Sequence, residues 1–118
     1  MAPTTKAVGT TAEDRALAYL EAQGLHLLMR NYRLKGGEID LILRDSTHVV
    51  FAEVRYRRSN QFGGAIHSID ARKQRKLIMT ATHYIQRYNV TLPVRFDVIA
   101  LSSKDDIQWV QNAFTADG

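Results

Sequence analysis

Apolar and polar residues alternate along two short stretches in the first half of the chain, which indicates two β-strands. The first stretch, GEIDLIL, carries Glu38 and Asp40 among aliphatic residues. The second, VVFAEVR, carries Glu53 and Arg55 in the same way. Charged residues inside otherwise apolar strands are unusual, so these four positions are the first candidates for chemistry.

Strict alternation assigns each strand residue to one of two faces. In the first strand one face holds Glu38, Asp40 and Ile42, and the other holds Ile39, Leu41 and Leu43. In the second strand one face holds Val49, Phe51, Glu53 and Arg55, and the other holds Val50, Ala52 and Val54. Acidic side chains are therefore expected on one face of each strand.

The segment DSTH, residues 45–48, is short and turn-like, so the two strands are expected to form an antiparallel hairpin. With a loop of two or four residues, the numbers of facing partners sum to 93, so Asp40 opposes Glu53 and Glu38 opposes Arg55. A three-residue loop would instead place the two acids on different faces. Like charges that face each other are destabilising, so either Arg55 or a divalent metal with oxygen ligands must offset them.

Similar patterns predict the other elements. A helix is expected over 11–23 with Thr10 as its N-cap, and a second helix from the cap Ser68 to about Tyr88. Further strands are expected over 25–33, 93–101 and 107–114. Residues 1–9 are expected to be a flexible tail, followed by a single domain over 10–118. The order αβββαββ, with a helical crossover after a meander, predicts an α/β or α+β domain whose mixed sheet is flanked by helices.

The composition narrows the class of protein. The chain has 118 residues and no cysteine, which excludes disulfides, thiolate zinc sites and cysteine nucleophiles. Its start contains no apolar signal-peptide core, and no apolar run is long enough to span a membrane. We therefore expect a cytoplasmic protein without a membrane partner.

Positive charge is concentrated after the acidic strands. The net charge is +4 and the isoelectric point is about 9.6. Between residues 55 and 76 one acid, Asp70, is outnumbered by seven cations, which are Arg55, Arg57, Arg58, Arg72, Lys73, Arg75 and Lys76. The four cations in the second helix are expected to point sideways or outward. This segment predicts binding to a nucleic acid, although a solvated loop and helix end would have a similar composition.

An acid on one strand, followed by Glu-x-cation on its neighbour, suits metal-assisted hydrolysis of phosphodiesters. The carboxylates would hold Mg²⁺ or Mn²⁺, and the cation would stabilise the transition state. On the first helix, Glu13 lies one turn before the apolar stripe, so it either reaches the site or caps the helix. Asp97, another acid within a strand, is expected to pair with Arg95.

Several motifs resemble those of the small bacterial YraN-like proteins, a family similar to the restriction-endonuclease-like PD-(D/E)xK nucleases, which include archaeal Holliday-junction resolvases. The resemblance covers about residues 9–101. Near the start, the matching residues are EDRA (13–16), YL (19–20) and Gly24. The later matching segments, in order, are RNYR, GEIDLI, VFAEVRYR, FG, KQR and RFDV. It implies a restriction-endonuclease-like fold, nuclease chemistry on DNA, and a Mg²⁺ or Mn²⁺ cofactor.

Carried over by position, the resemblance makes Asp40 and Glu53 metal ligands, Glu13 a third acid and Gln74 a helix residue that faces the site. Arg55 stands where the superfamily has lysine. Arginine stays charged at all accessible pH values, so it can stabilise a transition state but cannot act as a base.

Three hypotheses stay open at this point. The first is a Mg²⁺- or Mn²⁺-dependent nuclease that acts on DNA, with branched or recombination intermediates as candidate substrates. The second is a non-catalytic nucleic-acid-binding protein that keeps the nuclease fold. The third is an interaction module in which Glu38–Arg55 and Arg95–Asp97 are structural pairs. The sequence leaves undetermined the choice between DNA and RNA, the formation of a homodimer, and the pathway.

Overall fold

The computed structural model describes residues 5–57, 69–102 and 106–116, with the backbone alone for residues 5–10. Its elements follow the predicted order αβββαββ. They are α1 (Thr5–Ala22), β1 (His26–Leu34), β2 (Gly37–Arg44), β3 (Val49–Arg57), α3 (Ala71–Arg87), β4 (Val94–Ser102) and β5 (Ile107–Phe114). None of the described helices is both long enough and apolar enough to cross a bilayer.

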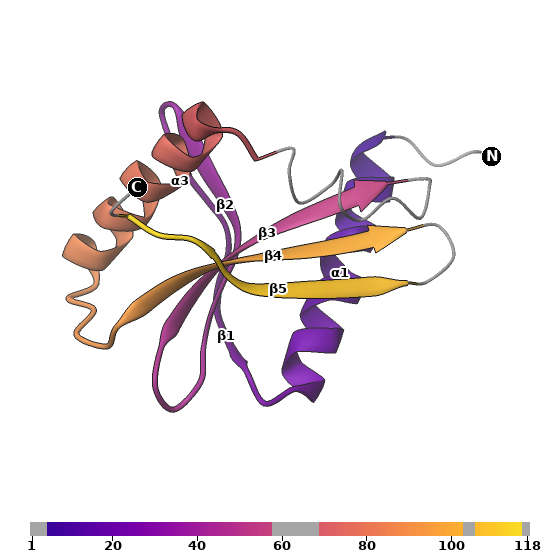
Figure 1. Cartoon of the computed structure of the whole chain (residues 1–118), viewed down its shortest axis with the longest axis horizontal. Coiled ribbons are helices and arrows are strands. Elements are labelled where there is room, and N and C mark those ends of the chain that lie inside the picture. The colour runs from indigo at the N-terminus through magenta and orange to yellow at the C-terminus, as the bar shows by residue number, and fades with distance from the viewer. Residues whose placement is uncertain (1–4, 58–68, 103–105, 117–118) are drawn as a thin grey trace.

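The five strands form one mixed sheet in the order β1-β2-β3-β4-β5. Neighbouring strands are antiparallel except for β3 and β4, which are parallel and are joined by the crossover that contains α3. The helices α1 and α3 pack on opposite faces of this sheet (Figure 1). The fold is thus α/β with a mixed sheet flanked by helices, in agreement with a restriction-endonuclease-like fold.

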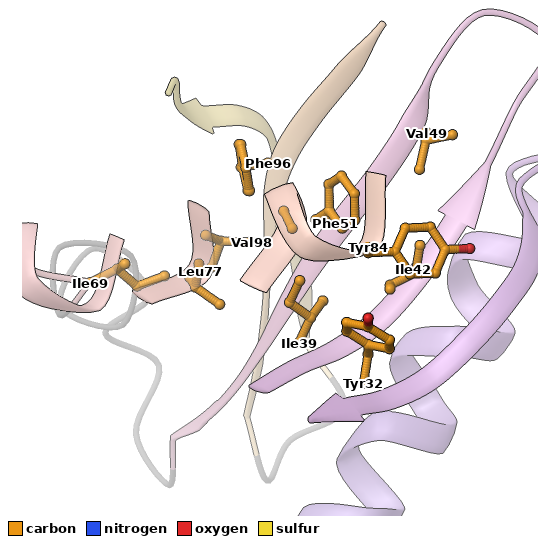
Figure 2. Packing of buried hydrophobic residues seen from close by; sticks show 11 residues of the cluster. Tyr32, Ile39, Ile42, Val49, Phe51, Ile69, Leu77, Tyr84, Phe96 and Val98 are labelled. Carbon is orange, nitrogen blue, oxygen red and sulfur yellow. The ribbon is translucent and has the colours of Figure 1, made fainter. Parts of the chain in front are cut away.

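The core on the α3 face is rich in aromatic side chains. Phe51 lies beneath Tyr84 with an edge-to-face geometry and a centroid separation of 5.8 Å. Figure 2 shows strand residues such as Ile39 and Ile42 pointing toward this helix. Leu77 and Tyr84 are seven residues apart and therefore lie on the same side of α3. This apolar stripe packs directly against the sheet.

The core on the α1 face is lined by small helix residues and aliphatic strand residues. Ala12, Ala16 and Leu20 are buried at helical spacing along α1. They pack against strand residues that share the opposite side of the sheet, which are Leu41, Leu43, Val50, Ala52, Ile99 and Leu101. Because alanine side chains are small, the helix lies close to the sheet. Glu13, the polar residue at the start of this stripe, therefore lies near the strands.

Both helices differ from the sequence prediction at their first residues. Because α1 begins at Thr5 rather than at about Thr11, Thr10 lies inside the helix and is not its N-cap. The N-cap of α3 is Asp70, whose Oδ1 accepts a hydrogen bond from the backbone N of Lys73 at 2.8 Å. This is the usual way in which an aspartate satisfies a free amide at a helix start. The expected cap, Ser68, lies outside the described residues.

The hairpin has the four-residue loop and the register that bring the acids to the same level. Partners from Leu41–Ala52 to Arg44–Val49 sum to 93, which is the register expected for a loop of two or four residues. The predicted alternation along β2 is wrong at one point, because Ile39 packs in the same cluster as Ile42 rather than with Leu41. The strand is irregular there: its ladder with β3 ends at Leu41, and Asn31, across from Asp40, has a left-handed φ of 51°.

Glycine is required at position 37, where β2 packs directly against α3. A Cβ at this position would collide with Oγ1 of Thr80 and lie 3.2 Å from the carbonyl oxygen of Lys76. We expect Gly37→Ala to lower the free energy of unfolding by about 1–3 kcal/mol, as overpacking does. Urea unfolding followed by circular dichroism would measure the change.

A second substitution identifies the cause of that loss. If the collision with Thr80 is responsible, Gly37→Ala combined with Thr80→Ala should be more stable than the sum of the two single effects predicts. Additive losses would mean that the collision is not the cause.

Candidate active site

The predicted acidic strands separate at Asp40. From the hairpin loop their ladder extends only to Leu41, the residue that follows Asp40 in the sequence. The backbone N of Val54 instead donates a hydrogen bond to Oδ2 of Asp40 at 2.8 Å. The carboxylate therefore replaces a backbone acceptor of the neighbouring strand. This bond turns the Asp40 side chain toward β3, beside Glu53.

Glu53 is a buried acid with only 7% of its surface exposed. One carboxylate oxygen, Oε1, lies 3.8 Å from the ammonium of Lys73 on α3. The other, Oε2, is buried and has no hydrogen-bond partner in the described part of the chain. A buried carboxylate oxygen without a partner is energetically costly, so this position favours binding of a cation or a donor.

Burial and the nearby charges raise the pKa values of both acids. Burial first, and then the charge of Glu53, raise the pKa of Asp40 to about 8 against the opposing bond from Val54. Burial also raises the pKa of Glu53, while the charges of Lys73 and Arg55 and a hydrogen bond with Asp40 oppose that increase. The two carboxyl groups therefore lie close enough for each to influence the charge of the other. Without a bound cation they favour holding a proton.

Arg55 is the cation that follows Glu53 on the same strand. It is half-buried, and its charge acts on the Glu53 carboxylate. Its Nε is buried and has no hydrogen-bond partner among the described residues. A guanidinium N–H that is free of protein partners suits an oxyanion ligand.

Lys73 was expected to point sideways or outward, and the structure places it at the acid pair. It lies four residues before Leu77, so helical periodicity continues the buried stripe of α3 to this lysine. That periodicity was the available signal. The stripe of a helix predicts a side chain's direction, but only the tertiary structure shows that Glu53 lies there.

Two further acids, Glu13 of α1 and Glu38 of β2, lie near Asp40. Asn31 donates through Nδ2 to Glu13 at 3.1 Å and to Glu38 at 3.2 Å, and thereby bridges the helix and β2. The charges of both acids contribute to the raised pKa of Asp40. Glu13 therefore lies near the site, in contact with Asn31 and Arg30, and the role of Asn31 was not predicted.

The expected pair of Glu38 with Arg55 is wrong. Glu38 instead binds Nε of Arg33 through Oε2 at 3.2 Å, because the irregularity at Asp40 turns it toward β1. The third hypothesis therefore loses one of its two structural pairs.

The predicted pair of Arg95 with Asp97 is confirmed. Asp97 is 1% exposed and accepts from Nε of Arg95 at 3.0 and 3.1 Å. It also accepts from Nε1 of Trp109 at 2.8 Å and from the backbone N of Asn112 at 2.9 Å. With all these donors Asp97 is a structural carboxylate that joins β4 to β5.

The other predicted site residues are distributed around this centre. Gln74 is half-buried and donates to the carbonyl of Ile69 at 3.0 Å, so its amide nitrogen holds the start of α3. Of the predicted nucleic-acid-binding cations other than Lys73, those that the structure describes are exposed: Arg57, Arg72, Arg75 and Lys76. Arg58 lies outside the described residues.

The acid pair fits a hard divalent cation. Both residues supply carboxylate oxygens, one of which has no hydrogen-bond partner among the described residues. A bound cation would lower the raised pKa values of both acids. No group of three or more His, Cys, Asp or Glu side chains that could hold a metal occurs in the described ranges. A pair is enough for Mg²⁺, which usually binds one or two carboxylates together with substrate phosphates.

Comparisons with known proteins agree with the resemblance found in the sequence. The model of the Uncharacterised protein family UPF0102 matches residues 12–101. A UPF0102 protein of Janthinobacterium sp. (strain Marseille) is 52% identical over 108 residues, which cover 92% of this chain and 87% of the relative. A UPF0102 protein of Paracidovorax citrulli is 53% identical over 117 residues, covering 96% and 86%. The chain therefore belongs to the Uncharacterised protein family UPF0102.

Proposed function

We propose that this protein is a Mg²⁺- or Mn²⁺-dependent nuclease that hydrolyses phosphodiester bonds of DNA, with branched or recombination intermediates as candidate substrates. The observation that carries the proposal is the pair of half-buried Asp40 and buried Glu53, placed where β2 and β3 separate. The buried Oε2 of Glu53, which has no hydrogen-bond partner in the described ranges, supports a cation at this point. When bound, such a cation supplies water activation and neutralises charge on the scissile phosphate.

The chain's own residues supply the remaining parts of the mechanism. The Val54 amide holds Asp40 in place by its hydrogen bond. Arg55, whose Nε has no hydrogen-bond partner within the described part of the chain, stabilises negative charge that develops on the phosphate. Since a guanidinium cannot serve as a base, Arg55 acts as an electrostatic group and not in proton transfer.

Cleavage assays test the proposal directly. The protein is incubated with branched, single-stranded and duplex DNA in Mn²⁺ or in EDTA. We expect cleavage of at least one substrate in Mn²⁺, loss of cleavage in EDTA, and loss in Glu53→Gln. The control Glu21→Gln changes an exposed acid of α1 and should cleave normally. Absence of Mn²⁺-dependent cleavage on all three substrates would overturn the proposal.

Thermal melting tests the metal site independently of activity. A ligand that binds only the folded state stabilises it by about 2.7 kcal/mol at 100 times its Kd. Mn²⁺ should therefore raise the Tm of the wild type but not that of Glu53→Gln, whereas Glu21→Gln should respond as the wild type does. An equal response in all three proteins would show that the pair does not bind the ion.

The alternative is a non-catalytic nucleic-acid-binding protein that keeps the nuclease fold, and Arg55 in place of lysine favours it. This alternative predicts DNA binding that weakens steeply with salt and is independent of metal. It also predicts that Glu53→Gln binds as tightly as the wild type. Metal-dependent cleavage would exclude it.

A further inference from the structure

A hollow lies beside the acid pair, between the β1–β2 turn and the first turns of α3. Its volume is about 370 Å³, and its polar lining comes from Arg33, Glu38, Lys73 and Lys76. Figure 1 shows this turn beside the beginning of α3. We propose that the hollow is a subsite for a backbone phosphate of the nucleic acid, adjoining the phosphate that is cleaved. This inference rests on the proposed function.

Close packing of the turn against the helix preforms the hollow. Gly37 has no side chain, so the backbone of β2 lies directly against Lys76 and Thr80. Gly36 has a left-handed φ of 93°, which turns the chain at this point. The Asp70 cap holds the backbone of Lys73. The β1–β2 turn and the start of α3 thus hold the cationic side chains on two sides of the hollow.

The charge of the lining favours an oxyanion. Among the described residues that line the hollow, three are cations, Arg33, Lys73 and Lys76, and one is an acid, Glu38. That acid is already bound by Nε of Arg33 at 3.2 Å and by Asn31 at 3.2 Å. The lining therefore keeps a formal excess of two positive charges, which is the kind of surface that binds phosphate oxygens.

Lys73 connects the hollow to the acid pair. Its ammonium lies 3.8 Å from Glu53, and the same side chain lines the hollow. The side chain is 37% exposed, so its ammonium can also reach a phosphate oxygen in the hollow while it stays beside Glu53. A strand whose scissile phosphate is at Asp40 and Glu53 would place a neighbouring phosphate within reach of Lys73.

A second hollow, of about 420 Å³, is larger but less suited to phosphate. It lies near the last turn of α3, where its lining includes His83, Gln86 and Arg87. Its one arginine is positioned over the ring of Tyr88, 5.4 Å from the centroid. Volume alone therefore does not identify the subsite, and proximity to the acid pair together with charge does.

The test measures binding in EDTA, where cleavage cannot contribute. Fluorescence anisotropy follows a labelled single-stranded oligonucleotide at several salt concentrations. We expect Arg33→Gln with Lys76→Gln to weaken binding at least tenfold, and the slope of log affinity against log salt to fall by about 0.7 for each lost phosphate contact. The control, Arg44→Gln with Arg87→Gln, removes the same charge at exposed positions elsewhere and should weaken binding less than threefold.

Inorganic phosphate locates the site on the protein. In titrations followed by amide NMR, shifts should concentrate at Gly36, Gly37 and Lys73 in the wild type and disappear in the double variant. If the double variant unfolds, Lys76→Glu alone, at an exposed position, provides the same comparison. Equal losses in the two double variants, or shifts that concentrate elsewhere, would overturn the subsite.

The two proposals can fail separately. Normal metal-dependent cleavage with an unaffected Arg33→Gln/Lys76→Gln variant would remove only the subsite. Absence of cleavage with a selective loss of binding in that variant would remove only the nuclease.

Discussion

Replacing Asp40 by Asn should abolish cleavage and at the same time make the protein more stable at pH 8. Cleavage should fall by at least about 100-fold, because even outer-shell partners of metal ligands cost about 10- to 100-fold when removed. Stability should rise because the variant no longer places a second acid, shielded from water, beside Glu53. The amide oxygen of Asn can still accept the hydrogen bond from Val54, so the strand geometry is retained.

The pH dependence of stability identifies the physical cause. The folded-state pKa of Asp40, about 8, lies above an unfolded value of about 3.9. Between these values the folded protein holds a proton that the unfolded chain releases. The free energy of unfolding therefore falls as pH rises, by up to about 1.4 kcal/mol per pH unit. The variant lacks this slope, so its advantage should be small near pH 4 and largest above pH 8.

Urea unfolding in EDTA from pH 4 to 9 would measure both curves. Asp106→Asn, at an exposed position, serves as the control and should follow the wild type. Parallel curves for wild type and Asp40→Asn would mean that Asp40 is ionised throughout this range. The raised pKa of Asp40 would then be contradicted.

Replacing Asp97 by Ala should have the opposite effect on stability, although this residue is also an acid within a strand. The change removes the carboxylate that binds Arg95, Trp109 and the amide of Asn112. Arg95 has only 13% of its side chain exposed, so its charge would be left without its main partner. Breaking a buried pair in this way costs about 3–5 kcal/mol.

Urea unfolding followed by circular dichroism would measure that loss. Trp109 is the single tryptophan, so its fluorescence would report the local change at the same time. Asp14→Ala is the matched control, because Asp14 pairs with Arg30 at 2.8 Å but is 58% exposed and should cost less than about 1 kcal/mol. If Asp97→Ala unfolds entirely, Asp97→Asn offers a milder test. Equal stability of the Asp97 and Asp14 variants would contradict the structural role.

Much of the fold was determined by local sequence patterns. Alternation and helical periodicity predicted the element order and the mixed sheet, because burial of one face selects these periods directly. The turn-like residues 45–48 predicted the hairpin but left its register open between an even loop and a three-residue loop, and the structure has the four-residue loop. The helix starts were less well determined, because several residues near each start can serve as caps.

The tertiary structure alone decided the details of the site. It ended the β2–β3 ladder at Leu41, turned Glu38 to Arg33 and brought Lys73 of α3 to Glu53. None of these contacts follows from a local period, because each depends on where strands diverge and where a distant helix lies. The sequence by itself determined which acids lie within the strands, and tertiary packing determined which of them lie next to each other.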